Sequence, residues 1–128
     1  MAYMRWITTI IVVLLAGCAA FSGYMSLADL ASSNQSKLAQ LSVGMNKDDV
    51  ISHMGMDAAK TKDGIVNNPW TVETFIGNDG FQYQVLYYVT RKNPRFTPVT
   101  KSLTTPLVLK SDQLIGWGAD ALYRISGK

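Results

Sequence analysis

The chain has 128 residues, about the length of one ordinary domain, and its 12 basic and 9 acidic side chains give a formal net charge of +3. This surplus of positive charge is too small to indicate the basic face that nucleic-acid-binding domains use. It also gives no reason to expect an acidic partner. Cysteine occurs once, so the core must form without a disulfide. We therefore expect a single domain with no nucleic-acid partner.

The first 18 residues have the order of an export signal. The basic Arg5 precedes an apolar run over residues 6–15, which ends in Leu15-Ala16-Gly17-Cys18. These last four residues resemble the lipobox of bacterial lipoproteins, in which the cysteine receives a diacylglycerol, the signal is cut just before it, and the new amine is acylated. The resemblance implies that residues 1–17 are a signal peptide and that Cys18 is the lipidation site.

Two other interpretations of this segment stay open. A transmembrane helix needs about 20 apolar residues, whereas the run over residues 6–21 is shorter and contains two threonines. An ordinary secretory signal cut after Ala20 would use a poor small-x-small site. We expect lipidation, because a charged start, an apolar core and a cysteine-terminated motif coincide. Residues 18–26 are then a tether to a domain over residues 27–128.

Two helices are predicted next. Ser26 opens a capping box for the first helix, and a second start is available near Ser33. The second helix has Asn46 as its N-cap and Gly55 as its left-handed stop. Residues 56–69 are predicted to be a polar connection.

Beyond this connection the apolar side chains alternate with period two, which is typical of strands with two distinct faces. Gly77-Asn78-Asp79-Gly80 has the composition of a hairpin turn. Residues 91–103 contain two prolines and four basic residues and are predicted to be a long loop. Residues 119–128 form either a short helix or a trailing end. The predicted strands are residues 70–76, 81–90, 106–109 and 114–117.

The segment Leu41-Ser42-Val43-Gly44-Met45-Asn46-Lys47-Asp48-Asp49-Val50, followed by Met54-Gly55, resembles the SmpA/OmlA (BamE-like) group of outer-membrane lipoproteins. That group has a leucine, two variable residues, Gly-Met, a helix cap, two polar residues, an apolar run and a closing glycine. The similarity covers roughly residues 34–118, although Gly55-Met56-Asp57 stands where the group usually has Gly-x-Pro. It implies an α+β fold with two N-terminal helices packed on a three- to four-stranded antiparallel sheet.

No constellation of residues suits catalysis. His53, the only histidine, would need an orienting carboxylate and a nucleophile to act as a base, so we expect it at a surface or capping position. The thiol of Cys18 is consumed by lipidation. The aspartates between residues 48 and 63 lack the alternating oxygen ligands of a calcium loop. We therefore expect no enzymatic activity, no cofactor, no metal and no small-molecule substrate.

A partner surface is predicted on the second strand. Alternation places Leu86 and Tyr88 on one face, opposite a more apolar set formed by Phe81, Tyr83, Val85, Tyr87 and Val89. The helices can cover only one face, so we expect the more apolar set beneath them and Leu86 and Tyr88 exposed. Exposed aromatic side chains rimmed by polar groups are typical of protein-binding surfaces.

These expectations combine into a non-catalytic, lipid-anchored envelope protein that acts as a binding or scaffolding subunit in outer-membrane protein assembly or envelope integrity. Its partners are the membrane, through the lipid on Cys18, and an envelope protein. The resemblance implies the periplasmic face of the outer membrane, since Ala19 stands where aspartate would retain a lipoprotein at the inner membrane. The alternatives are an inhibitor or stress-response module on the same fold and, less favoured, a hydrolase with an unrecognised site.

Overall fold

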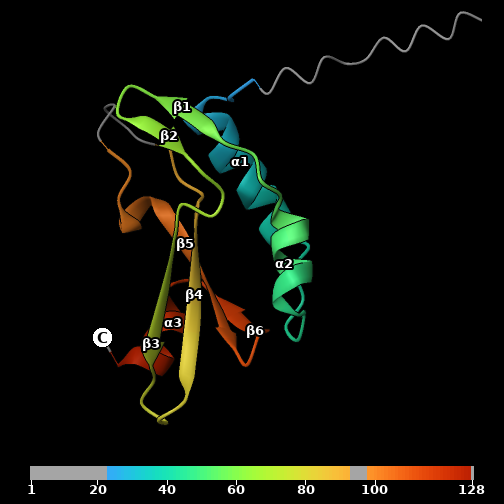
Figure 1. Ribbon diagram of the computed structural model, residues 1–128, viewed down its shortest axis with the longest axis vertical. Coiled ribbons are helices and arrows are strands. Elements are labelled where there is room, and N and C mark those ends of the chain that lie inside the picture. Colours follow the sequence, from blue (N-terminus) through green and yellow to red (C-terminus); the bar gives the residue numbers. More distant parts are fainter. Residues whose placement is uncertain (1–22, 93–97, 128) are drawn as a thin grey trace, which may run out of the picture.

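The computed structural model describes residues 23–92 and 98–127 (Figure 1). The predicted signal peptide, Cys18 and most of the predicted tether therefore lie outside the described residues, as do residues 93–97 of the predicted loop. No helix among the described residues has the length and apolar character needed to cross a bilayer. The elements are α1 (Leu27–Leu38), α2 (Lys47–Met54), β1 (Ala59–Thr61), β2 (Gly64–Val66), β3 (Thr71–Ile76), β4 (Gln82–Val89), the 3-10 helix η1 (Lys101–Leu103), β5 (Thr104–Lys110), β6 (Gln113–Trp117) and α3 (Ala119–Ser126).

The architecture is α+β, with a four-stranded antiparallel sheet in the order β3-β4-β5-β6. The helices α1 and α2 pack on one face of this sheet and α3 packs on the other (Figure 1). This arrangement confirms the predicted fold class and the two N-terminal helices. The predicted polar connection over residues 56–69 is wrong in part, because β1 and β2 form a small hairpin whose Ala59 and Val66 pack against Leu30 of α1.

Both N-terminal helices begin where their caps predict. The Ser26 hydroxyl accepts a hydrogen bond from the Asp29 amide at 3.1 Å, so α1 begins at the earlier of its two candidate starts. The Asn46 side chain accepts the Asp49 amide at 2.8 Å at the start of α2. Gly55 follows α2 with φ 74°, a backbone conformation that favours glycine.

The sheet is buried on both faces. Beneath α1 and α2 lies a cluster that includes Leu38, Val50 and Met54 of the helical layer and Leu86, Tyr88, Leu107, Leu109 and Leu114 of the sheet. On the opposite face, Tyr83, Val85, Tyr87 and Val108 are buried with Ala121, Leu122 and Ile125 of α3 packed against them. The α3 helix is therefore the second cover of the sheet.

The expectation that Leu86 and Tyr88 face outward is wrong. Their side chains are 1% and 0% exposed, and they pack beneath α1 and α2. Leu86 pairs with Leu107 across β4 and β5, so the aliphatic side chains of β5 extend the Leu86 face rather than the face of Tyr87. The Tyr83–Tyr87 face is covered instead by α3, so residues 85–89 of β4 are buried on both faces.

The outer edge of β6 is paired with the segment that leads into α2. The Gly44 amide donates to the Leu114 carbonyl at 2.7 Å, and the Leu114 amide donates to the Met45 carbonyl at 2.8 Å. The Lys47 amide adds a bond of 2.8 Å to the Asp112 carbonyl. This segment closes one edge of the sheet and fixes the start of α2 against it.

Replacing Gly44 with valine should destabilise the domain by about 1–3 kcal/mol. Gly44 has φ 96°, which β-branched residues rarely adopt, whereas a Cβ there would meet no atom within 4 Å. The cost is therefore backbone strain and not a clash. Urea denaturation measures the effect, with Ser42→Val as the control at an exposed position. Equal stability of the two variants would contradict the role of Gly44.

Candidate interaction surface

The described residues expose three large apolar side chains along β3 and at the β3–β4 turn. Val72 is 45% exposed, Ile76 66% and Phe81 56%. Val72 and Ile76 lie on the face that α2 covers elsewhere, because they pair with Leu86 and Gln82 of β4. The helix reaches only the β5–β6 side of this end of the sheet, where the Lys47 amide bonds Asp112. This apolar corner, Val72, Ile76 and Phe81, replaces Leu86 and Tyr88 as the candidate contact surface.

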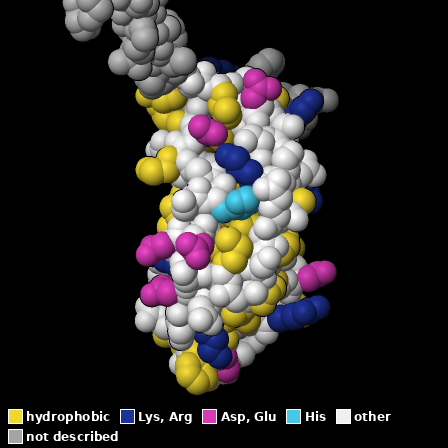
Figure 2. All heavy atoms as spheres, turned by 90° about the vertical axis from the view of Figure 1, so that its right-hand side faces the viewer, with side chains coloured by type: hydrophobic (Ala, Val, Ile, Leu, Met, Phe, Trp, Pro, Cys, Tyr) yellow, Lys and Arg dark blue, Asp and Glu magenta, His cyan; other side chains and the backbone are white. Residues whose placement is uncertain are grey.

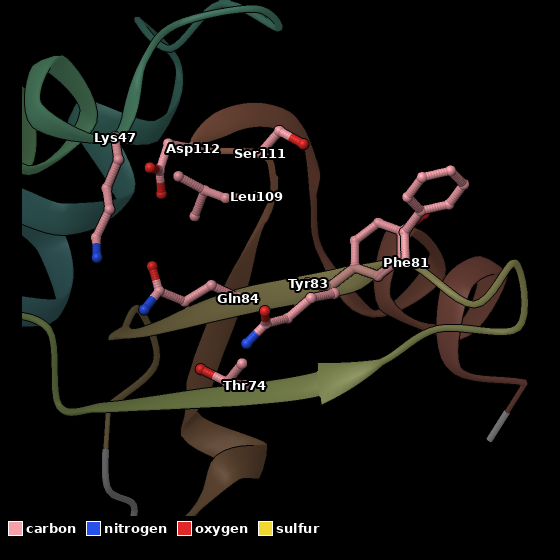
Figure 3. A pocket seen from close by; sticks show the side chains of 9 residues that line it. Lys47, Thr74, Phe81, Tyr83, Gln84, Leu109, Ser111 and Asp112 are labelled. Atoms are coloured by element: carbon pink, nitrogen blue, oxygen red, sulfur yellow. The ribbon is translucent and has the colours of Figure 1, made fainter.

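Next to this corner the sheet and the start of α2 enclose a hollow of about 460 Å³ (Figure 3). Lys47 extends into it from α2 and Gln84 from β4, while Ser111 and Asp112 stand at its rim (Figure 3). Amide, hydroxyl and amine groups surround the apolar Leu109. Such a lining can donate hydrogen bonds to a peptide and accept them from it. The lining residues are Lys47, Thr74, Phe81, Gln82, Tyr83, Gln84, Leu109, Ser111 and Asp112.

The rim of the hollow is a tight turn between β5 and β6. Lys110 pairs with Gln113, and the two residues between them, Ser111 and Asp112, have φ of 51° and 59°. Positive φ at both central residues is the signature of a type I′ turn, whose twist matches that of the flanking strands. The turn brings the Asp112 carbonyl to the first amide of α2, so the position of the Lys47 side chain depends on it.

At the other end of the hollow, Asp79 accepts hydrogen bonds from three residues, one of them the Phe81 amide at 3.0 Å. Its carboxylate accepts hydrogen bonds from the Tyr83 hydroxyl and, at 3.1 Å, from the Lys110 amine, which also lies 4.0 Å from the centre of the Phe81 ring. The Tyr83 hydrogen bond, with smaller contributions that include Lys110, lowers the pKa of Asp79 to about 2. The same carboxylate raises the pKa of Tyr83 and of Lys110. At neutral pH the Asp79 carboxyl is therefore ionised, the Lys110 amine is protonated and the Tyr83 hydroxyl keeps its proton. These three groups fix the β3–β4 turn.

A second network lies on the α3 face. Glu73 forms an ion pair with Lys101 and accepts a hydrogen bond from the Tyr87 hydroxyl at 3.2 Å. The Lys101 hydrogen bond lowers the pKa of Glu73. Burial, with the neighbouring Glu73 charge, raises the pKa of Tyr87 to about 12. This network links β3, β4 and η1. Its titratable groups therefore form bonds to one another that stabilise the fold.

A second hollow, of about 500 Å³, lies where α3 begins and is lined partly by Tyr87, Arg91, Lys101, Pro106 and Leu122. Its floor is mainly apolar, and one of its two cations, Lys101, is paired with Glu73. The other cation, Arg91, forms no ion pair with any described residue and gives the hollow a weak electrostatic complement to an anionic group.

His53 caps a helix, as the sequence predicts. Its Nε2 lies 2.9 Å from the Lys37 carbonyl at the end of α1, and the Lys37 amine donates to the Met54 carbonyl at the end of α2. Each helix thus supplies a side chain that contacts a backbone carbonyl in the last turn of the other helix. Figure 2 shows this histidine on a face where acidic and basic side chains are scattered without forming a continuous patch of one sign. Among residues 23–92 and 98–127, no group of three His, Cys, Asp or Glu side chains is placed to hold a metal ion.

The sequence contains the signal for the apolar corner, since Val72, Thr74 and Ile76 share one face of an alternating strand. That pattern does not say which strand lies at the edge of the sheet. The exposure of these side chains depends on the order of the strands in the sheet, which only the folded structure shows.

Comparison with known proteins identifies a family but no characterised relative. No curated protein and no solved structure shows significant similarity to the chain. Residues 10–124 match the model of the family described as "Protein of unknown function (DUF3192)", and the chain therefore belongs to that family.

Proposed function

We propose that the protein is a non-catalytic, lipid-anchored envelope protein that serves as a binding or scaffolding subunit. The observation that carries the proposal is the order of its first 18 residues: a basic residue, an apolar run and Leu15-Ala16-Gly17-Cys18. The family match begins at residue 10 and so includes Leu15-Ala16-Gly17-Cys18, though not Arg5. Two or more acyl chains on one cysteine give stable anchoring, whereas a single chain binds membranes only reversibly.

The described domain supports a binding role in two ways. Its titratable pairs, Asp79–Lys110 and Glu73–Lys101, are engaged in holding strands and turns together. Three of its exposed large apolar side chains, Val72, Ile76 and Phe81, lie along β3 and the β3–β4 turn beside the amide and hydroxyl groups of the hollow. A polar rim around apolar anchors is the usual composition of a protein-binding surface.

The two N-terminal helices on an antiparallel sheet agree with the likeness to the SmpA/OmlA group, which favours a role in outer-membrane protein assembly. A role in envelope integrity outside barrel assembly is the alternative. Copurification of the lipoprotein in mild detergent separates the two, because the first requires recovery of barrel-assembly subunits and the second requires other partners.

Cys18→Ala should abolish incorporation of labelled fatty acid and leave the signal uncut, since no thiol remains to receive the lipid. The matched variant Ala19→Asp should keep the label, because the cysteine is retained, and should shift the protein toward the inner-membrane fraction. Gel mobility, label incorporation and membrane fractionation measure the three effects. Label on the Cys18→Ala protein would contradict lipidation at this residue, and unchanged fractionation of Ala19→Asp would contradict the outer-membrane assignment.

A further inference from the structure

The two edges of the four-stranded sheet differ. The β6 edge is paired with residues 44–47 through backbone hydrogen bonds of 2.7–2.8 Å. The β3 edge is the other end of the strand order, and no described segment pairs with its outer side. An unpaired edge is a template for another strand, and proteins commonly protect it with proline, a bulge or outward-facing charge. Residues 71–76, Thr-Val-Glu-Thr-Phe-Ile, contain no proline, and their one charge, Glu73, is paired with Lys101.

The register of β3 shows which of its backbone groups are free. The Gly77 amide bonds to the Phe81 carbonyl at 2.8 Å, and the pairing continues through Phe75 with Tyr83 and Glu73 with Val85. In an antiparallel ladder only alternate residues bond to a given neighbour. The amides and carbonyls of Val72, Thr74 and Ile76 therefore point away from β4. The same three residues carry the side chains that are exposed beside the hollow.

This edge is complementary to itself. Antiparallel pairing of two copies with Thr74 opposite Thr74 places Val72 of each copy opposite Ile76 of the other. The apolar side chains of the two free edges would thus contact each other across the new strand pair. Such apolar cross-strand contacts stabilise a sheet. Glu73 falls opposite Phe75 of the other copy, so no like charges face each other. A twofold interface needs one surface that fits a second copy of itself, and this strand has that property.

We propose that β3 is a self-association edge, through which two copies of the chain join their sheets into one eight-stranded antiparallel sheet. The two Thr74 residues exchange backbone hydrogen bonds at the twofold axis. Apolar pairs between Val72 and Ile76 flank them on both sides. The proposal rests on the sheet alone and does not depend on lipidation of Cys18.

Cysteine crosslinking of the full-length protein in membranes tests this register. Hydrogen-bonded residues in an antiparallel pair lie about 5.5 Å apart at Cα, within the range of about 4.4–6.8 Å that a disulfide requires. Thr74→Cys should therefore form a disulfide-linked dimer on mild oxidation. Val72→Cys alone should not, because its two copies would be four residues apart along the strand, about 14 Å. Coexpressed Val72→Cys and Ile76→Cys chains, distinguished by tags, should crosslink to each other.

The parent chain, whose only cysteine is Cys18, must give no dimer under the same conditions. Adding Thr74→Lys to the Val72→Cys and Ile76→Cys chains should reduce crosslinking at least fivefold, since it places two like charges opposite each other. Gln35→Lys adds the same charge at an exposed position of α1, away from the edge, and should leave crosslinking unchanged. A monomeric Thr74→Cys protein, equal crosslinking by Val72→Cys alone, or a Thr74→Cys adduct with a different protein would each overturn the proposal.

Discussion

Replacing Tyr88 with alanine is expected to lower the free energy of unfolding by about 3–5 kcal/mol, the usual cost of removing a fully buried aromatic side chain. Tyr88 is completely buried and packs in the cluster that joins α1 and α2 to the sheet. The truncation would leave a cavity between the helical layer and β4. Urea denaturation measures the loss. Tyr123→Ala is the matched control, because Tyr123 is exposed on α3 and its truncation should cost less than about 1 kcal/mol.

The hydroxyl of Tyr88 allows a sharper test of the same site. It is buried, and none of the described residues forms a hydrogen bond with it. Burial alone raises the pKa of Tyr88 to about 12. An unpaired buried polar group costs about 1–3 kcal/mol, so Tyr88→Phe should leave stability unchanged or raise it. Tyr87→Phe, which removes the bond to Glu73, should lower it. A loss above about 1 kcal/mol for Tyr88→Phe would mean that the hydroxyl has a partner in solution.

Features that depend on neighbouring residues could be predicted from the sequence. Ser26 and Asn46 cap their helices through side-chain oxygens that reach an amide three residues ahead. The α2 helix ends at Gly55, whose positive φ stops it. These signals act within one helical turn, so no knowledge of the rest of the chain is needed. The strands of the four-stranded sheet were predicted for a similar reason, since alternation along a strand is a local pattern.

Which face of β4 lies beneath α1 and α2 could not be predicted, because this depends on residues far away in the sequence. Counting apolar residues on β4 favours the Tyr83–Tyr87 set for the helical layer, whereas the structure places Leu86 and Tyr88 there. Two distant elements decide the outcome. The β5 strand contributes Leu107 and Leu109 to the Leu86 face, and α3 supplies a cover for the other face. A strand with bulky apolar side chains on both faces therefore indicates a sheet that has helices packed on both of its faces.

The β1–β2 hairpin and the free edge of β3 illustrate two further limits. The hairpin strands have three residues each, too short for a period to be recognised, and Asp63-Gly64 at their turn was the only clear signal. The edge position of β3 follows from the strand order, which alternation does not contain. The candidate contact surface therefore required the fold, although Val72 and Ile76 had been placed on the correct strand. Phe81 had been placed at the start of the next strand, whereas it lies in the β3–β4 turn.

The buried amide pair of Asn34 and Asn68 is the second site where a large loss is expected. The Asn34 amide donates to the Asn68 side-chain oxygen at 2.7 Å and to the Val89 carbonyl at 2.9 Å. The Asn68 amide donates back to the Asn34 oxygen at 2.9 Å and to the Met54 carbonyl at 3.1 Å. The pair thus joins α1, the end of α2, the segment before β3 and the end of β4, although the two residues are 34 positions apart.

Asn34→Ala should lower the free energy of unfolding by about 2–5 kcal/mol, since it leaves the Val89 carbonyl and part of the Asn68 side chain buried without partners. Gln35→Ala is the control, because Gln35 is the next residue of α1 and is exposed. Asn68→Ala should cost a similar amount. The double variant should lose less than the sum of the two, by at least about 1 kcal/mol, because either truncation alone already breaks the shared hydrogen bonds. Additive losses would show that the two amides act independently, and a small loss for Asn34→Ala would mean that water replaces the pair.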